Sequence, residues 1–262
     1  MSTRAQQFQA EVVRREQLSS HFVRIVLGGD GLVGFASTGV PDEWVALTVP
    51  GQFQTRYYTV RSWRDGQLTL DVVVHEHGLV TEWASTDCVG DTVTISEPKA
   101  SFKMPDTAGW LLLVGDLTAL PAIARITETV TDLPVTAWVE APHGEIDGYV
   151  VGDVTWVEPP PGAETATASV VEAIEWPDGE GYFWMAGESA QMRAIRKHLM
   201  REVKLPSTAY DVMGYWRSGQ PRQPRAVDRA IDPGPIWRAG KAAGKSDDQI
   251  WADYDAAREA QQ

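Results

Sequence analysis

The pattern of apolar residues changes near Pro105, and this change constrains the fold more than any other feature of the 262-residue sequence. Before it, short β-prone segments alternate with turn residues, as where residues 22–27 are followed by the glycines of 28–31. Several short strands at such close spacing predict a barrel or sandwich. After it, continuous apolar runs such as 110–115 are separated by helical segments. Buried strands that alternate with helices predict a doubly wound parallel α/β domain.

We therefore expect three regions: an N-terminal antiparallel β-barrel over residues 1–105, a doubly wound parallel α/β domain over 106–219, and a C-terminal extension over 220–262. The expected barrel strands are 11–13, 22–27, 43–49, 68–74 and 93–95. The expected α/β strands are 110–115, 135–139, 154–157, 182–185 and 210–213, with helices over 119–130 and 190–204. In the extension, residues 246–249 fit a capping box that opens a short helix to about Glu259.

Composition narrows the class of partner. The net charge of −13 disfavours nucleic acid and anionic membranes as partners, unless a local basic patch exists. The single cysteine, Cys88, excludes an internal disulfide and cysteine-based zinc or iron–sulfur sites. No apolar stretch approaches the ~20 residues of a membrane span, and the first seven residues contain no signal-peptide core. We expect a soluble, cytoplasmic protein.

The segment Arg-Tyr-Tyr-Thr at 56–59 carries the densest chemical signal. A β-barrel that holds a flavin needs an aromatic ring, a hydroxyl or backbone donor, and a cation for the pyrophosphate. Tyr58, Thr59 and Arg56 supply these three groups, and Arg56 and Tyr58 share a face if the segment is a strand. The alternative is a structural strand with a cross-strand arginine and core tyrosines.

A second segment, residues 74–84, suits phosphate binding. A strand ends at Val74, Gly78 frees the backbone, and a short helix begins near Thr81. Helix N-termini bind phosphate through free N–H groups and the helix dipole. The triplet His75, Glu76 and His77 could instead suggest a metal site, but it lacks further obvious ligands, and we expect none.

Three strand ends in the second domain carry candidate ligand contacts, because ligands of open α/β sheets lie at the carboxyl ends of strands. These ends are Gly115-Asp116, Gly187-Glu188 and the segment 214–219. No Gly-x-Gly-x-x-Gly fingerprint and no phosphate-binding Gly-x-x-x-x-Gly-Lys-Ser/Thr loop is present. For 184–189 the alternative is an ordinary βα loop with Ser189 as helix N-cap, and for 214–219 it is packing that docks the tail.

Taken in this order, the segments resemble the siderophore-interacting protein family of ferric-siderophore reductases, which belongs to the ferredoxin–NADP reductase-like flavoproteins. The resemblance runs from about residue 8 to 219 and implies an FAD-binding barrel followed by an NAD(P)H-binding domain. The chain departs from the family pattern at 79–82, where Gly-Pro-Ala-Ser is usual, and at Leu117, where Glu is usual.

The resemblance also implies roles for individual residues. It implies cofactor contacts at Arg56, Tyr57, Tyr58, Thr59, Val74, His75, Gly78, Thr81, Trp83, Asp116, Thr118 and Ala119 for the flavin, at Gly187 and Glu188 for the nicotinamide nucleotide, and at the aromatic pair Tyr215 and Trp216. We further expect Arg61, Arg125 and Arg217 to form a basic pocket for an anionic ferric siderophore.

The implied activity is transfer of electrons from NADH, NADPH or a ferredoxin through FAD to a ferric siderophore, which releases Fe(II). This chemistry requires no catalytic acid or base from the protein. The tail from 220 to 262 leans toward the members that use NADH or ferredoxin. Two alternatives stay open: a general NAD(P)H:flavin or ferredoxin-type oxidoreductase without siderophore preference, and a siderophore-binding protein without redox chemistry.

Overall fold

The computed structural model describes residues 6–51, 55–74, 78–142, 146, 148–159, 165–217, 239 and 242–245. The chain forms two compact units, Met1–Arg222 and Gln223–Gln262. The helix expected over 246–259 lies outside the described residues. A barrel and a sheet, both in the first unit, make up the described fold.

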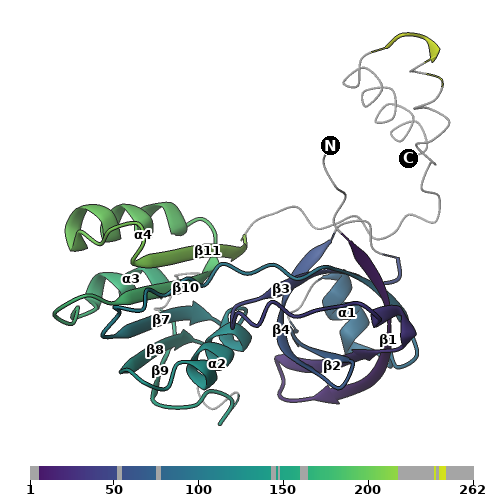
Figure 1. Ribbon diagram of the computed structural model, residues 1–262, viewed down its shortest axis with the longest axis horizontal. Helices are drawn as coiled ribbons and strands as arrows, with labels where there is room; N and C mark the ends of the chain where they lie inside the picture. The colour runs from purple at the N-terminus through teal and green to yellow at the C-terminus, as the bar shows by residue number, and fades with distance from the viewer. Residues whose placement is uncertain are drawn as a thin grey trace. The chain divides into compact units, whose positions relative to one another are not determined.

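The barrel is closed and antiparallel, as the sequence predicts, and it has six strands instead of the five that were expected, because β4 adds to them (Figure 1). Its spatial strand order is β1-β2-β5-β4-β3-β6, with the bounds β1 (Gln7–Gln17), β2 (Phe22–Gly28), β3 (Trp44–Thr48), β4 (Arg56–Arg64), β5 (Gln67–Val73) and β6 (Thr92–Ser96). Alternate side chains fill the interior, as Leu68, Leu70 and Val72 do along β5. The short helix α1 (Leu79–Ser85) adds Val80 and Ala84 to this core, and a 3₁₀ turn, η1 (Asp30–Leu32), adds Leu32.

The second domain is a parallel five-stranded sheet in the order β11-β10-β7-β8-β9. Its strands are β7 (Leu111–Asp116), β8 (Val135–Glu140), β9 (Val154–Val157), β10 (Tyr182–Glu188) and β11 (Tyr210–Trp216). Every residue of β7 and β10 is buried, because helices cover both faces. Helix α2 (Leu120–Thr129) covers one face, and α3 (Thr167–Ala173) and α4 (Met192–His198) cover the other (Figure 1). The predicted doubly wound domain is confirmed.

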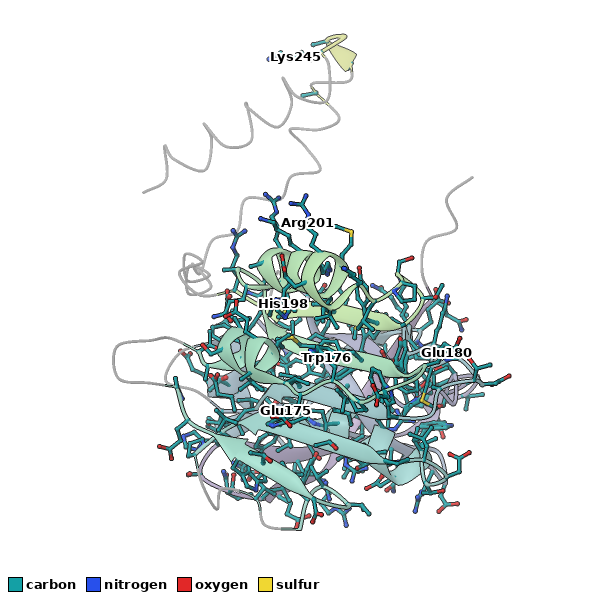
Figure 2. All side chains as sticks on the ribbon, turned by 90° about the vertical axis from the view of Figure 1, so that its left-hand side faces the viewer. Glu175, Trp176, Glu180, His198, Arg201 and Lys245 are labelled. Carbon is teal, nitrogen blue, oxygen red and sulfur yellow. The ribbon has the colours of Figure 1, made fainter. Side chains whose placement is uncertain are left out.

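Two helices differ from expectation. The helix expected over 190–204 is α-helical only to His198 and continues as a π-helical turn, η2 (Leu199–Val203), which ends at Lys204 in the left-handed conformation (φ 64°). Helix α3 was not predicted, because only Thr167 and Val171 of its seven residues are buried and no apolar stripe marks it. Beside it lies Trp176 (Figure 2). The Trp176 ring packs against the rings of Trp110 and Phe183.

Helix α2 also contacts the barrel. Phe22, an outward-facing residue of β2, belongs to the same apolar cluster as Ile123 and Ile126 of α2. Arg125 of α2 donates to the carbonyl oxygen of Val60 on β4 at 2.6 Å. Helix α2 is therefore one of the elements that join the barrel to the sheet domain. In the described part of the chain, no helix has the length and apolar character to cross a membrane.

Candidate functional site

Three of the predicted motifs meet at the carboxyl edge of the sheet, here called the sheet edge. Asp116 ends β7, Glu188 ends β10 and Trp216 ends β11, and the parallel register places Glu188 beside Trp216. The indole Nε1 of Trp216 donates to Asp116 Oδ2 at 2.6 Å. Segments that are 100 residues apart in the sequence are thus joined by one hydrogen bond. These three residues lie close together because the carboxyl ends of parallel strands all lie at the same edge of a sheet.

Asp116 accepts three hydrogen bonds and is 7% exposed. Besides Trp216, the backbone N–H of Thr118 donates to Oδ1 at 2.8 Å and the Thr118 hydroxyl donates to the same oxygen at 2.5 Å. All these donors are neutral. Burial therefore raises the pKa of Asp116, and the hydrogen bonds from Thr118 and Trp216 offset only part of that effect.

Glycines permit the close packing of the sheet edge. A Cβ added at Gly187 would lie 2.7 Å from Asp116 Oδ2, and one at Gly115 would lie 2.5 Å from the Cβ of Ala119. Ala119 is fully buried at the start of α2, and its N–H donates to the Asp116 carbonyl at 3.0 Å. The backbones at this edge consequently approach more closely than residues with side chains would allow.

Glu188 and Ser189 fix the turn that leads into α4. The buried Glu188 carboxylate accepts from the N–H of Ala190 at 2.6 Å. Ser189 does not cap α4, because its hydroxyl donates instead to the carbonyl oxygen of Trp216 at 2.6 Å. The contact of Ser189 with Trp216 holds the end of β10 against the end of β11. Gly187 and Glu188 therefore lie at the sheet edge, and their predicted contact with a nicotinamide nucleotide stays a prediction.

The barrel motif reaches this region through Thr59. Thr59 is buried on β4, and the hydroxyl of Tyr215 on β11 lies beside its side chain. The Tyr215 hydroxyl is buried without a partner in hydrogen-bond geometry among the described residues. A buried donor left unpaired costs about 1–3 kcal/mol. This hydroxyl is therefore a candidate contact for a bound group.

The other residues of the barrel motif differ in exposure. Arg56 and Tyr57 are exposed at the start of β4, and Tyr57 is 69% exposed. Tyr58 is half-buried, packs against the barrel core and has its pKa raised by burial. An exposed cation beside an aromatic ring suits a ligand that carries phosphate and a planar ring.

The residues expected on the phosphate side of the site lie around α1. Gly78 precedes the helix, the Thr81 hydroxyl donates to the Val73 carbonyl at 3.4 Å, and Trp83 Nε1 donates to Asp91 Oδ2 at 2.8 Å. Val74 packs against the barrel core. The side chains of Thr81 and Trp83 thus have contacts within the barrel. His75, Glu76 and His77 lie outside the described residues.

Two of the three arginines assigned to a substrate pocket are paired with carboxylates, and the third is exposed. Arg61 makes a two-pronged ion pair with Glu128 of α2, at 2.9 and 2.5 Å. Arg125 pairs with the buried Glu43 at 3.1 Å. Arg217 is exposed, next to Trp216. Arg61 and Arg125 therefore link the barrel to α2, and the substrate role of all three stays a prediction.

Sequence reasoning missed a polar cluster, here called the Asp71 junction, where the barrel meets the sheet domain. Asp71 of β5 is 3% exposed and accepts from Arg24 through two hydrogen bonds of 2.8 Å. The Tyr149 hydroxyl also donates to it, and the guanidinium carbon of Arg61 lies 5.2 Å from the centre of the Tyr149 ring. No local pattern marks Asp71 or Tyr149, which lie 78 residues apart in the sequence.

Two cavities lie away from the 56–59 motif, whose residues line neither of them. The larger, of about 370 Å³, lies on the outer wall of the barrel beside α2. The smaller, of about 200 Å³, lies in the segment before and along β9, between Ile146 and Trp156.

Comparison with known proteins identifies the family. The family described as "Siderophore-interacting protein" matches residues 108–219, and the "Siderophore-interacting FAD-binding domain" matches residues 50–102. The chain belongs to the siderophore-interacting protein family. Its fold is that of the ferredoxin–NADP reductase-like flavoproteins, and the matched barrel carries the family's FAD-binding domain.

Three relatives of this siderophore-interacting protein illustrate the match. The NADPH-dependent ferric-chelate reductase of Escherichia coli is 25% identical over 239 residues, which cover 79% of this chain and 91% of that protein. An uncharacterized protein of Mycobacterium tuberculosis is 28% identical over 255 residues, with 80% and 90% covered. A siderophore utilization protein from T. fusca has a known crystal structure, which matches with a TM-score of 0.71 at 26% identity and covers 85% of this chain and 97% of its own.

The geometry of this family member fits FAD in two respects. The exposed Arg56 and Tyr57 offer a cation and a ring at one end of β4, and the unpaired Tyr215 hydroxyl offers a buried donor where β4 meets β11. Bound FAD would be held by residues of the 56–59 motif and by Tyr215. The contacts expected from His75 lie outside the described residues.

Proposed function

We propose that this protein is an FAD-dependent reductase that takes electrons from NADH or NADPH and delivers them to the iron of a ferric siderophore. The observation that carries the proposal is the meeting of the barrel motif with the sheet edge, through Thr59 beside Tyr215 and Trp216 on Asp116. FAD, when bound, converts a two-electron donor into a one-electron reductant, and Fe(II) leaves hard oxygen chelators far more readily than Fe(III) does.

The protein's own residues bind and orient the cofactor and the donor nucleotide. Arg56 provides a charge-assisted donor for a pyrophosphate, and Tyr57 and Tyr58 provide rings at the same strand end. Asp116 holds the indole of Trp216 in one orientation through the 2.6 Å hydrogen bond. Gly187, which has no side chain, lets the end of β10 pack directly against the Asp116 carboxylate. These groups orient a donor nucleotide at the sheet edge without a catalytic acid or base.

The substrate end of the proposal centres on Arg217. This side chain is exposed directly after Trp216 and is the predicted cation nearest in sequence to the sheet edge. Arg61 and Arg125 already contact carboxylates, so we expect them to contribute less to the binding of an anionic siderophore. Replacement of Arg217 by alanine should raise KM for a ferric siderophore and leave KM for the electron donor unchanged.

The test is anaerobic spectroscopy on the purified protein loaded with FAD. Addition of NADH or NADPH should bleach the visible flavin absorption, and later addition of a ferric siderophore should restore it while a ferrous chelator traps Fe(II). A protein that cannot be loaded with FAD, or whose flavin neither donor bleaches, would overturn the proposal.

The same experiment separates the alternatives. A general reductase would be reoxidised by simple ferric chelates as fast as by siderophores. A binding protein without redox chemistry would show siderophore affinity but no bleaching. A ferredoxin-dependent enzyme would be bleached by reduced ferredoxin and by neither nucleotide.

A further inference from the structure

The larger cavity lies apart from the proposed flavin site and gathers four arginines. We call it the arginine groove; it is lined by Arg14, Arg24, Arg61, Ser62, Arg64, Thr69 and Glu128. Its volume of about 370 Å³ falls within the range of roughly 300–1,000 Å³ that is typical of ligand pockets. Six residues of strand separate Tyr58 from Arg64, a rise of about 20 Å, so the groove is at the opposite end of β4 from Arg56.

Two β-bulges place arginines in this groove. Along β1 the inward positions are Phe8, Ala10 and Val12, so an unbroken strand would point Arg14 into the core. A bulge between Val12 and Arg14 shifts the register, and Arg14 instead pairs with Val26 on the outer face.

The bulge in β4 has the same effect. Val60 points into the core, and without a bulge the next inward positions would be Ser62 and Arg64. The irregularity between Val60 and Ser62 makes Trp63 the inward residue and turns Ser62 and Arg64 outward. Bulges that re-aim side chains in this way are frequent beside binding sites.

The polar groups of the groove are only partly used. Arg24 pairs with Asp71 and Arg61 pairs with Glu128. Within the described ranges, neither Arg14 nor Arg64 has a carboxylate partner, and the hydroxyls of Ser62 and Thr69 make no hydrogen bond. The buried Arg61 Nε also lacks a hydrogen-bond acceptor there. The groove therefore has unpaired guanidinium and hydroxyl donors, whereas the one carboxylate that lines it, Glu128, is already paired with Arg61.

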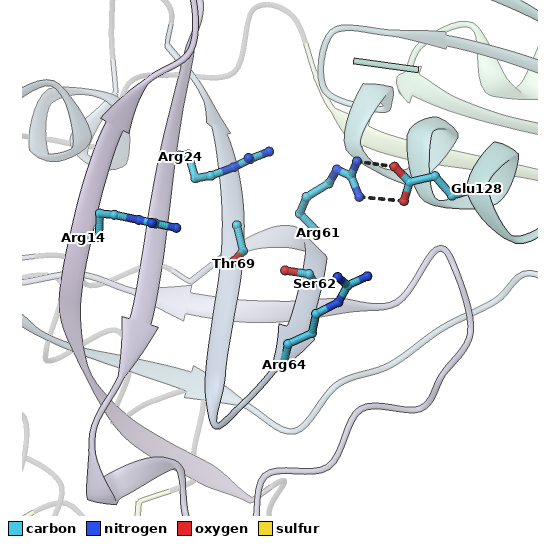
Figure 3. A pocket seen from close by; sticks show the side chains of 7 residues that line it. All are labelled: Arg14, Arg24, Arg61, Ser62, Arg64, Thr69 and Glu128. Carbon is cyan, nitrogen blue, oxygen red and sulfur yellow. Dashed lines mark hydrogen bonds and ion pairs between the residues drawn. The ribbon is translucent and has the colours of Figure 1, made fainter. Parts of the chain in front are cut away.

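Figure 3 shows how these donors are arranged. Arg14 and Arg24 reach into the groove from one side, Arg61 and Arg64 lie on the other, and Ser62 and Thr69 lie between them. Four guanidinium groups face one carboxylate in a chain of net charge −13. Guanidinium groups match the oxygen geometry of phosphates and carboxylates.

We propose that the arginine groove binds a compact polyanion, a small molecule with two or more phosphate or carboxylate groups. The negative charge of the whole chain disfavours extended polyanions such as nucleic acid, whereas a small ligand experiences chiefly the local arginines. The ligand contacts Arg14 and Arg64 and donors of Ser62 and Thr69. Because Arg61 also lines the groove, the ligand competes with Glu128 for this side chain.

The test is calorimetric titration of the FAD-loaded protein with pyrophosphate and, separately, with citrate, at constant ionic strength. The wild type should bind at least one of them saturably in a 1:1 ratio. Arg14→Ala/Arg64→Ala should weaken binding by on the order of tenfold or more. Glu128→Gln, which removes the competing carboxylate, should tighten binding severalfold.

The matched control is Arg193→Ala/Arg201→Ala, which removes two exposed arginines from α4 and η2; Arg201 points away from the sheet (Figure 2). It should leave the affinity unchanged. Absence of saturable binding to the wild type, or an equal loss in both double variants, would overturn the proposal. Preference for pyrophosphate over citrate identifies a phosphate ligand, and the reverse preference identifies a polycarboxylate. Neither result depends on reductase activity.

Discussion

Two buried aspartates, Asp71 and Asp116, occupy opposite electrostatic environments. Asp71 is 3% exposed and receives a two-pronged guanidinium from Arg24, with Arg61 Nε at 4.0 Å. Asp116 is 7% exposed and receives only neutral donors, from Thr118 and Trp216. The first carboxylate has its charge compensated, and the second has not.

This difference in charge compensation indicates different roles: Asp71 stabilises the fold, and Asp116 positions the Trp216 side chain. A buried carboxylate that is paired with a cation contributes chiefly to holding elements together, here the barrel and the sheet domain. A buried carboxylate without a cation has a raised pKa, which is a frequent property of functional sites. Substitutions around Asp71 should therefore lower chiefly the stability of the fold, whereas substitutions around Asp116 should also weaken ligand binding.

The largest expected effect is at the Asp71 junction. Arg24→Ala leaves Asp71 buried without its main cation and should lower the free energy of unfolding by about 3 kcal/mol. This is the low end for a broken buried pair, because 26% of the Arg24 side chain is exposed. Urea denaturation measures it, with Arg14→Ala as a control that should stay within about 0.5 kcal/mol of wild type. A loss below about 1 kcal/mol would contradict the structural role.

The next effect is at the sheet edge. Gly187→Ala puts a methyl group 2.7 Å from Asp116 Oδ2, so Asp116 or the strand must move. We expect a loss of about 1–3 kcal/mol in unfolding free energy and weaker binding of the donor nucleotide. Gly109→Ala is the matched control, since its Cβ would meet only a carbonyl oxygen at 3.4 Å. Equal behaviour of the two variants would show that the close approach at Gly187 is unimportant.

Removal of the Tyr215 hydroxyl, unlike the two substitutions above, should not lower the free energy of unfolding. Tyr215→Phe should leave the FAD-free protein as stable as wild type, or more stable by up to about 1 kcal/mol, because the Tyr215 hydroxyl has no partner in hydrogen-bond geometry among the described residues. FAD affinity should nevertheless fall by about tenfold. The control is Tyr182→Phe, which loses the hydrogen bond from the Lys103 N–H and should be destabilised by about 1 kcal/mol. Unchanged FAD affinity in Tyr215→Phe would remove this hydroxyl from the site.

The smallest effect concerns pH. Burial raises the pKa of Asp116 above the ordinary value of 3.8, so the folded protein holds this proton more tightly than the unfolded chain does. The associated stability is present below the unfolded pKa and is lost as pH rises through the folded pKa. The unfolding free energy of wild type should therefore fall relative to that of Asp116→Asn as pH is raised from below 3.8 toward neutral. A difference that is flat or rises with pH contradicts the assignment.

The sequence predicted the fold where local pattern decides it. The apolar runs at 110–115 and 182–185 correspond to β7 and β10 because strands buried in a parallel sheet need continuous apolar residues. Helix α3 escaped prediction because it buries few side chains. The change to a π-helical turn at Leu199 also leaves no mark in apolar periodicity, since its residues still fit a helical face.

The sequence predicted which segments form the candidate site, but it did not predict which side chains form ion pairs there. Asp116, Gly187 and Trp216 were foreseeable as neighbours, because each follows a parallel strand. The partners of Arg61 and Arg125 were not, because Glu128 and Glu43 are two among 36 acidic residues and nothing local distinguishes them. Pairings across a domain junction depend on tertiary geometry that single-sequence patterns do not contain.

The bulge at Arg61 has a consequence for protein engineering. One surplus residue separates a β4 segment whose even-numbered side chains face the core from a segment whose odd-numbered ones do. If the bulge were straightened with all residues kept, the two faces of everything downstream in the strand would exchange, with Trp63 sent to solvent and the Arg64 guanidinium sent into the barrel. The bulge, and not any single side chain, therefore sets which downstream residues of β4 face the core, and an engineered barrel that keeps this sequence must keep the bulge.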